Sequence, residues 1–362
     1  MNFVIAAGGT GGHLFPGLAV GEILRARGHA VMFFISEKEI DALATHGRSD
    51  FRFEKLPGIG MPQMLSLAFV KFLGRFKTGL DRCRALYQEF APDAVLGMGG
   101  FTSTGPILAG RLRKVPTFVH ESNAIPGKAN RLNARMVTAV LLGFADCAKH
   151  FPKARCEVTG TPIRASLSRK LPQPEALATF NLQPGRKTLL VMGGSQGAQG
   201  INRAIHDALP RLKDAPLQFI HLSGKQDEQR LRGAYAAAGL PAFVAAFHHR
   251  MEEAYSAADF CVARSGAASL TEVSHFALPS ILIPYPYAAE DHQTLNAKIF
   301  ERAGAAALLN ETEITGDAFS EKLRWLLAEP ARLSEMSARS AALAPKNAAE
   351  HVADILLKFR VR

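Results

Sequence analysis

The first residues of this chain that could do chemistry form a glycine-rich stretch, GGTGGH, at residues 8–13. An apolar run precedes the glycines and a helical pattern follows them, which predicts a strand, a turn and a helix. Such a turn offers backbone N–H groups and the positive end of a helix dipole to an anion. His13 closes the turn, where a histidine can act as a general base, bind phosphate as a cation, or cap the helix.

A second loop of the same design, GGSQGAQG, occupies residues 193–200. Neither loop matches the dinucleotide-binding fingerprint, because Leu14 and Ser195 stand where that fingerprint needs a glycine. Neither is a Walker loop, since no Gly-Lys-Ser or Gly-Lys-Thr follows. The repeated design favours two domains that each bind a phosphate group. The alternative is that the glycines only permit tight packing of strand on helix.

Three further stretches carry polar side chains just after apolar runs, at residues 119–131, 263–272 and 284–297. The first contains His120, Glu121, Asn123, Lys128 and Arg131. The last contains Glu290, Asp291, His292, Gln293 and Asn296. Mixed amides and carboxylates suit sugar hydroxyls, which need both donors and acceptors. The alternatives are a capped loop with solvated side chains for the first stretch and a helix cap by Asp291 for the last.

Metal chemistry is not predicted, because the chain contains no Asp-x-Asp pair to hold a divalent ion on a nucleotide diphosphate. The four cysteines are scattered and include no CxxC pair, so we expect neither a metal site nor a disulfide framework. Without a metal, a leaving diphosphate would be stabilised by backbone amides, a helix terminus and cations such as Arg164 or Arg264. No cofactor is expected.

Short apolar runs alternate with helical patterns through both halves of the chain. The expected buried strands are 2–7, 30–36, 93–99 and 116–122, then 187–194, 217–224, 259–266 and 279–285. Helical patterns begin near 15–27 and 80–89. This alternation is typical of parallel sheets with crossover helices. We therefore expect an α/β protein of two Rossmann-like, doubly wound domains.

The length of 362 residues also favours two domains. We place the first at residues 1–162 and the second at 163–340, with the joint near a Gly-Thr-Pro turn. A final helix within 341–362 is expected to return to the first domain.

The charge balance points to anionic partners, since 43 Lys and Arg residues against 32 Asp and Glu give a net charge of +11. The chain lacks a recognisable nucleic-acid-binding motif, so no nucleic acid partner is expected. No signal peptide or membrane-spanning run is visible, and the cysteine usage fits a reduced cytoplasmic compartment.

One segment, residues 61–84, could meet a membrane surface. Its apolar face would consist of Leu65, Phe69, Phe72 and Phe76. Its positive charge comes from Lys71, Arg75, Lys77, Arg82 and Arg84. Basic amphipathic segments of this kind bind anionic membrane surfaces. Packing of the aromatic face against the first sheet is the alternative.

Seven motifs together resemble those of the MurG family of glycosyltransferases, in the same order and spacing over essentially the whole chain. They are GGTGGHLFPGLAV, MGGFTSTGP, HESNAIPGKANR, GTPIR, GGSQGA, RSGAASLTE and DHQTLNA. The resemblance implies a GT-B fold, in which the two Rossmann-like domains face each other across a cleft. It also implies an inverting transfer of N-acetylglucosamine from UDP-GlcNAc to the C4 hydroxyl of undecaprenyl-diphospho-N-acetylmuramyl-pentapeptide (lipid I), giving lipid II for peptidoglycan synthesis.

The resemblance further implies where this reaction takes place and with which partners. The polyprenyl-diphosphate acceptor and an anionic membrane surface would place the chain peripherally on the cytoplasmic face of the plasma (inner) membrane. Proteins of cell-wall synthesis are possible partners, in keeping with roles of the family in cell shape and cell division.

The family's functional positions fall on particular residues here. On the donor side, Ser195 and Arg164 would meet the phosphates and Gln293 the transferred sugar. The helix start that carries phosphate and ribose consists of Ala267, Ala268, Ser269, Leu270, Thr271 and Glu272, with Glu272 on the ribose. His248 falls at the uracil position, where the family usually has an aliphatic residue.

In the first domain, the matching positions are Thr10, Gly11, Gly12, His13, Glu121 and Asn123. The first glycine loop would serve the acceptor diphosphate while touching the donor sugar. His13 is the first candidate for the general base and Glu121 the second. Ser122 stands where the family has glutamine.

Three other functions stay open at this point. One is another GT-B transferase that moves a sugar onto a lipid, and one is a UDP-sugar epimerase built on two similar domains. The third is a non-catalytic nucleotide- or nucleic-acid-binding module, suggested only by the basic charge.

Overall fold

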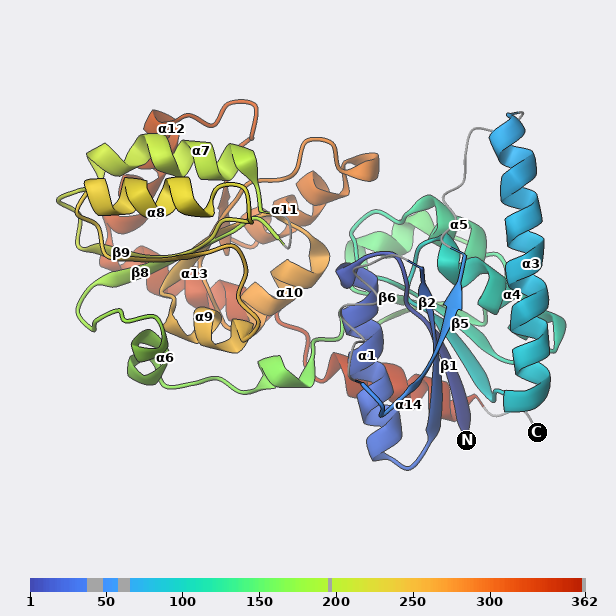
Figure 1. Cartoon of the computed structure of the whole chain (residues 1–362). Helices are drawn as coiled ribbons and strands as arrows, with labels where there is room; N and C mark the ends of the chain where they lie inside the picture. The colour runs from blue at the N-terminus through green and yellow to red at the C-terminus, as the bar shows by residue number, and fades with distance from the viewer. Residues whose placement is uncertain (38–47, 58–65, 195–196, 360–362) are drawn as a thin grey trace. The chain divides into compact units, whose positions relative to one another are not determined.

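The computed structural model describes residues 1–37, 48–57, 66–194 and 197–359. The chain divides into two compact units. Figure 1 colours the chain from blue at the N-terminus to red at the C-terminus. Unit 1 contains Met1–Arg164 together with Pro345–Arg362, and unit 2 contains Ala165–Ala344. Each unit is an α/β fold around its own sheet.

In the described part of unit 1, seven parallel strands form a sheet in the order β3-β2-β1-β4-β5-β6-β7. The strands are β1 (Asn2–Ala6), β2 (Ala30–Ser36), β3 (Arg52–Leu56), β4 (Ala94–Gly97), β5 (Thr117–Glu121), β6 (Ala139–Leu142) and β7 (Cys156–Val158). The helices are α1 (Gly11–Ala26), α3 (Leu67–Phe90), α4 (Thr104–Leu112), α5 (Lys128–Asn133) and α14 (Ala348–Lys358), with short 3-10 turns at Phe101–Ser103 and Ala145–His150.

Unit 2 repeats this plan with six parallel strands among its described residues, in the order β10-β9-β8-β11-β12-β13. The strands are β8 (Lys187–Met192), β9 (Leu217–Leu222), β10 (Ala242–Ala245), β11 (Phe260–Ala263), β12 (Ser280–Leu282) and β13 (Ala306–Leu308). The α-helices are α6 (Gln173–Thr179), α7 (Gln199–Ala208), α8 (Glu228–Ala237), α9 (Met251–Ala257), α10 (Ala267–His275), α11 (His292–Arg302), α12 (Gly316–Leu327) and α13 (Pro330–Leu343). Short 3-10 turns lie at Ala165–Ser168, Leu209–Arg211 and Ala289–Asp291.

The two faces of the first sheet bury alternate residues of the same strand. Phe3 and Ile5 of β1 pack in a cluster with residues of α1 and α14, such as Leu14 and Val352. Val4 and Ala6 face the other side, where α3 contributes Cys83 and Tyr87. Strands covered on both faces are continuously apolar, which is why these runs were recognisable in the sequence. In Figure 1 the red helix α14 lies beside the blue helix α1, and the two helices are in contact.

All eight expected strands are confirmed, but the sequence underestimated two helices and missed several short strands. Helix α1 begins at Gly11 rather than near Phe15, because the turn needs few residues beyond Gly8–Thr10. Helix α3 begins at Leu67, well before the expected Leu80, and the Ser66 hydroxyl accepts a hydrogen bond from Phe69 N at its start. Edge strand β3 is charged and half-exposed, so it lacks the apolar run that marks a buried strand.

Both glycine loops lie at topological switch points. The order of strands reverses between β1 and β4 in unit 1 and between β8 and β11 in unit 2. Ligands of open α/β sheets bind at the carboxyl ends of strands at such points. The loops after β1 and β8 therefore occupy the expected ligand positions of their sheets. Within the described residues, no helix has the length and apolar character needed to cross a membrane.

Candidate active site

The first glycine loop brings the start of α1 close to the neighbouring strand. A Cβ atom at Gly8 would lie 2.4 Å from the backbone nitrogen of Ser36, so only glycine fits there. Gly9 follows with a φ of +106°, in the region that favours glycine. Thr10 then caps the helix in an extended conformation, and its carbonyl accepts hydrogen bonds from the amides of His13 and Leu14. Thr10, Gly11 and Gly12 thus form the loop end and first turn, where helix amides attract anions.

His13 lies within this first turn rather than after the loop, and its ring is held from two sides. The Thr10 hydroxyl is 3.3 Å from Nδ1. On the other side is the backbone that follows β4, where a Cβ at Gly99 would come within 2.8 Å of Nε2. A Cβ at Gly100 would lie 3.6 Å from the ring. The absence of side chains at these two glycines makes the space that the imidazole fills.

Glu121, the other candidate base, ends β5 and is already fully engaged. Its Oε1 accepts hydrogen bonds from the Asn123 backbone at 2.9 Å and from the Asn123 side chain at 3.0 Å. Its Oε2 accepts from Gly127 N at 3.1 Å and from Asn130 Nδ2 at 2.8 Å. These four bonds satisfy the usual acceptor capacity of a carboxylate. Glu121 therefore shapes the loop around Asn123 and Gly127.

Asn130 is not among the functional residues predicted from the sequence, yet it binds Glu121 and lies beside the same glycine as His13. Its amide nitrogen donates to the His120 carbonyl at 3.1 Å and to Glu121. A Cβ at Gly99 would lie 3.4 Å from the same nitrogen, so Asn130 and His13 meet the same glycine. The asparagine is visible in the HESNAIPGKANR motif, but only the tertiary structure shows what it contacts.

Buried polar atoms without a hydrogen-bond partner gather in the same part of unit 1. Among the described residues they include Asn130 Oδ1, Asn133 Oδ1 and Thr104 Oγ1. Buried polar atoms are normally paired with protein groups or ordered water. Thr104 begins α4, and Asn130 and Asn133 belong to α5.

The neighbouring His120 is fully buried, and its burial lowers its pKa, so the ring is neutral. Its Nε2 is 2.9 Å from the Gly160 carbonyl and therefore donates, which leaves Nδ1 to accept from the Ser122 hydroxyl at 3.3 Å. Ser122, which replaces the family's glutamine, thus packs inward onto His120.

Unit 2 contains a cavity of about 820 Å³ at the switch point of its sheet. The second glycine loop and the start of α7 form one wall, and residues from the ends of β11, β12 and β13 form the other. The lining residues with functional groups in their side chains are Gln199, Arg203, Asp207, Arg264, Ser269, Tyr285, Tyr287, Gln293 and Glu311. Gly193, Gly194 and Gly197 line it through their backbone. Ser195 lies outside the described residues.

The helix start predicted for phosphate and ribose is α10, and α11 positions it. Ser265 Oγ donates to the Gln293 carbonyl at 2.8 Å, while Asn296 Nδ2 donates to the Ser265 carbonyl at 3.0 Å. The Gln293 side chain accepts from Tyr285 N at 2.9 Å, which turns its amide toward the cavity wall. These contacts fix Gly266, the cap of α10, at the cavity.

The six predicted residues at this helix start do not face the same way. Ser269 lines the cavity, whereas Leu270 is fully buried in the core and Thr271 donates to the Ala267 carbonyl. Ala267 is buried and Ala268 is half-buried. Glu272 accepts a hydrogen bond from Tyr255 OH at 2.7 Å. Leu270 and Thr271 could therefore contact a ligand only through their backbone.

Two predicted residues have close partners of their own. The guanidinium carbon of Arg164 lies 4.3 Å from the centre of the Phe15 ring of α1, a cation–π contact. His248 Nε2 is 3.0 Å from Glu253 Oε2, a buried carboxylate that also binds Arg250. The His248 side chain is thereby directed onto Glu253. Neither is among the residues that line the cavity.

Arg264, expected as a cation for the diphosphate, instead binds other groups of the protein. Its Nη1 and Nη2 form a two-point contact with Glu311 at 2.6 and 2.9 Å. Nη1 also donates to the carbonyls of Ile283 and Pro284. This arginine therefore joins the ends of β11, β12 and β13, and its positive charge is already compensated.

We expect Glu311→Ala to lower the free energy of unfolding by about 2–4 kcal/mol, because Arg264 would keep a buried, uncompensated charge. The Arg264 and Glu311 side chains are only 11% and 17% exposed. Guanidinium denaturation measures the change. Asp317→Ala, at an exposed ion pair with Arg211, is the control and should cost less than about 1 kcal/mol. Equal losses in the two variants would show that the Arg264–Glu311 pair is not a structural contact.

Comparison with known proteins now decides the family. The N-terminal domain of glycosyltransferase family 28 matches residues 3–142, and the C-terminal domain of that family matches residues 188–352. The chain belongs to glycosyltransferase family 28. Its full-length relatives are transferases of the MurG family, to which it therefore also belongs.

Two curated relatives of this MurG-family chain carry the name UDP-N-acetylglucosamine–N-acetylmuramyl-(pentapeptide) pyrophosphoryl-undecaprenol N-acetylglucosamine transferase. The one from Geobacter sulfurreducens is 38% identical over 359 residues, which are 98% of this chain and 97% of the relative. The one from Halalkalibacterium halodurans is 35% identical over 354 residues, 97% of each chain.

Solved structures agree on the fold. The crystal structure of Acinetobacter baumannii MurG has a TM-score of 0.79 at 27% identity and covers 99% of this chain and all of its own. UDP-GlcNAc 2-epimerase from Neisseria meningitidis reaches 0.69 at 16% identity, covering 99% of this chain and 100% of its own, a likeness of fold alone. The expected pair of Rossmann-like α/β domains of the GT-B type is thus confirmed, and a transferase is favoured over an epimerase.

Proposed function

We propose that this MurG-family chain transfers N-acetylglucosamine from UDP-GlcNAc to the C4 hydroxyl of lipid I, forming lipid II with inversion at the sugar. The observation that carries the proposal is the cavity at the second switch point, in a chain related over its full length to transferases of that name. The cavity offers the backbone of a glycine loop, the start of α10 and the amide of Gln293. Such groups suit a diphosphate and a sugar.

The donor nucleotide is assigned to unit 2. The diphosphate would rest on the backbone of Gly193, Gly194 and Gly197 and on the start of α10. The GlcNAc would meet Gln293, and Glu272 would bind the ribose. Since Arg264 is bound to Glu311, backbone amides and the helix dipole carry most of the stabilisation of the leaving UDP. The backbone at His248 is assigned to uracil, and Ser195 and Arg164 to the phosphates.

The acceptor diphosphate is assigned to the first glycine loop of unit 1, formed by Thr10, Gly11 and Gly12. In the reaction, the acceptor C4 oxygen forms a bond to the anomeric carbon while the bond from that carbon to the β-phosphate oxygen breaks. The electron pair of the broken bond leaves with UDP, and the proton of the C4 hydroxyl passes to the His13 ring. Asn123, held by Glu121, is assigned to the transferred sugar.

Transfer of labelled GlcNAc from UDP-GlcNAc to a short-chain lipid I analogue tests this function. We expect a labelled disaccharide lipid with inverted configuration and release of UDP. Transfer only to diacylglycerol, or from another nucleotide sugar, would make the chain a different lipid glycosyltransferase. Release of an epimer without any lipid acceptor would overturn the transferase assignment.

The acceptor lipid implies contact with a membrane surface, and helix α3 is proposed to provide it. Phe69, Phe72 and Phe76 form a stacked row with ring centres 5.8 and 6.2 Å apart, and Phe72 packs edge-on against Phe101. This row is half-buried, so part of the aromatic face packs on unit 1. Val70 and Leu73, in contrast, are 66% and 49% exposed. Leu65 lies outside the described residues.

Exposed basic residues accompany these two side chains, namely Lys71, Arg75 and Lys77. A helix face that combines apolar and basic side chains suits an anionic bilayer surface. We therefore propose peripheral binding of this helix to the cytoplasmic face of the inner membrane.

Replacing Val70 and Leu73 together by glutamate should strongly reduce binding to vesicles that contain phosphatidylglycerol. The substitution removes exposed apolar area and adds negative charge to the helix, which the anionic lipid repels. It leaves the Phe72–Phe101 packing in place. Co-sedimentation with vesicles measures the effect. Trp325→Glu, an exposed aromatic residue of unit 2, is the control and should bind as the wild type does. Unchanged binding of the double variant would remove α3 from the proposed membrane contact.

A further inference from the structure

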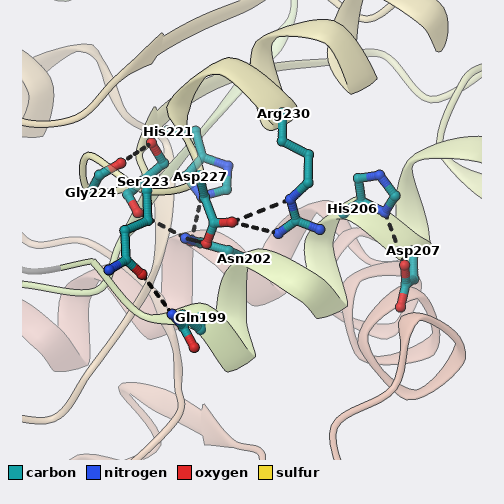
Figure 2. A network of polar contacts seen from close by, with 10 residues as sticks. Gln199, Asn202, His206, Asp207, His221, Ser223, Gly224, Asp227 and Arg230 are labelled. Atoms are coloured by element: carbon teal, nitrogen blue, oxygen red, sulfur yellow. Dashed lines mark hydrogen bonds and ion pairs between the residues drawn. The ribbon is translucent and has the colours of Figure 1, made fainter.

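A buried network of polar side chains lies behind the second glycine loop, shown in Figure 2. It joins Asn202 on α7, His221 and Ser223 at the end of β9, and Asp227 at the start of α8. Asn202, His221 and Ser223 are each no more than 2% exposed. None of these three lines the cavity, and the reaction proposed above does not use them.

The orientation of every group in this network follows from Asn202. Its amide nitrogen donates to the Ser223 carbonyl and to Asp227 Oδ2, both at 2.8 Å. Its Oδ1 must therefore accept, and the atom in contact is His221 Nε2 at 3.0 Å. Nε2 carries the proton, which leaves Nδ1 to accept from Tyr235 OH at 3.1 Å. Burial lowers the pKa of His221 to about 3, so this neutral tautomer persists through the physiological range.

Asp227 closes the network at the protein surface. Its carboxylate accepts from Asn202 and also binds Arg230 at 2.8 Å, as Figure 2 shows. These contacts hold the pKa of Asp227 below its ordinary value although its burial acts in the opposite direction. A second link, from Gln199 Nε2 to Gln226 Oε1 at 2.7 Å, ties the first residue of α7 to the same turn. The turn after β9 is thus fixed to α7 at two points.

This turn is the surface on which the glycine loop rests. A Cβ at Gly197 would lie 2.2 Å from the Ser223 carbonyl oxygen and 3.0 Å from Gly224 Cα. Gly197 also has a φ of +75°, and its amide donates to the Gly194 carbonyl. The Ser223 carbonyl that Asn202 holds is therefore the same group that Gly197 packs against. A shift of this carbonyl would therefore shift the backbone of Gly197.

We propose that Asn202, oriented by His221, is a positioning residue that sets the backbone at Gly197 and Gly194 of the second glycine loop for the diphosphate of the nucleotide donor. The inference rests on the proposed function for the identity of the donor. It adds that the affinity for the diphosphate depends on two buried side chains that do not touch it. The affinity for uridine, which lacks the phosphates, should not depend on these two side chains.

The test compares UDP with uridine on Asn202→Ala and on His221→Leu, by calorimetry for UDP and NMR titration for uridine. We expect both variants to bind UDP about tenfold more weakly, since each leaves a buried polar group of the network without its partner. Uridine affinity should stay at the wild-type value, which also shows that the base site is folded. His221→Gln, whose amide can donate from near the Nε2 position, should recover most of the UDP affinity.

The outcomes separate this proposal from the function on which it rests. Equal weakening of UDP and uridine, or no weakening of either, would overturn the positioning role. If Asn202→Ala fails to fold, the pair His221→Leu and His221→Gln still decides it. A wild-type chain that binds UDP but transfers no GlcNAc would overturn the proposed function and leave this test valid, whereas a wild-type chain that binds no UDP would overturn both.

Discussion

Replacing His13 by alanine should lower kcat by about 10²–10⁴-fold, the usual contribution of a general base. The imidazole is held between the Thr10 hydroxyl and the Gly99–Gly100 turn, at the first turn of α1. Among ordinary side chains, the imidazole is the one whose ring nitrogen can take up a proton near neutral pH. The affinity for UDP should not change, because the donor nucleotide is assigned to unit 2. Steady-state transfer to a lipid I analogue and calorimetry with UDP measure the two quantities.

Two comparisons make the His13 experiment decisive. The pH–rate profile of the wild type should fall on its acidic side as the base becomes protonated, and His13→Ala should lose that dependence. Glu121→Gln keeps the shape of the side chain but weakens its four accepted hydrogen bonds, so we expect lower thermal stability with a smaller loss of kcat. The roles would be reversed if Glu121→Gln lost the acidic limb and His13→Ala kept it.

The second large effect is expected from Gly99→Ala, which changes no group that could take part in the chemistry. The new Cβ would lie 2.8 Å from His13 Nε2 and 3.0 Å from Cδ2, so the ring must move. A displaced catalytic group can cost on the order of 10²-fold in rate. The φ of +112° adds a strain of roughly 1–3 kcal/mol for a residue with a side chain. Transfer assays should therefore show a low kcat in a protein that still folds and binds UDP.

Gly105→Ala is the matched control for this substitution. Gly105 lies in the first turn of α4, a few residues from Gly99, and a Cβ there would have no neighbour within 4 Å. Its kcat should equal that of the wild type, and helix propensity predicts slightly greater stability. If Gly99→Ala were as active as Gly105→Ala, the position of the His13 ring would not limit the reaction.

The predictions from the sequence are confirmed for elements whose pattern lies in consecutive residues. Residues 2–7 and 187–194 were recognisable as buried strands because both faces of a parallel strand are apolar. The edge strand β3, with the sequence RFEKL, was missed because half of its surface faces water. The early start of α3 is not evident from the sequence either, since the amphipathic pattern at 61–84 contains no clear helix boundary.

The candidate functional residues also divide into those that local spacing reveals and those whose contacts come from distant segments. The glycine loops and His13 could be found from spacing alone, because the strand, turn and helix that form each loop are consecutive. The roles of Arg264 and Glu121 could not. Arg264 binds Glu311, which lies 47 residues later, and Asn130 reaches Glu121 from the next helix.

The sequence by itself determined the two-fold α/β plan, the two glycine-rich loops between strand and helix, and the family to which the motifs belong. These properties depend on the periodicity of apolar residues and on short consecutive motifs. Only the tertiary structure decided which charged groups are free to act. It showed that Glu121 and Arg264 are held by other protein groups and that Gly99 makes room for His13. It also showed that Asn202 holds the Ser223 carbonyl against which Gly197 packs. The physical reason is that a hydrogen bond depends on distance and direction between atoms of distant segments, which no local pattern encodes.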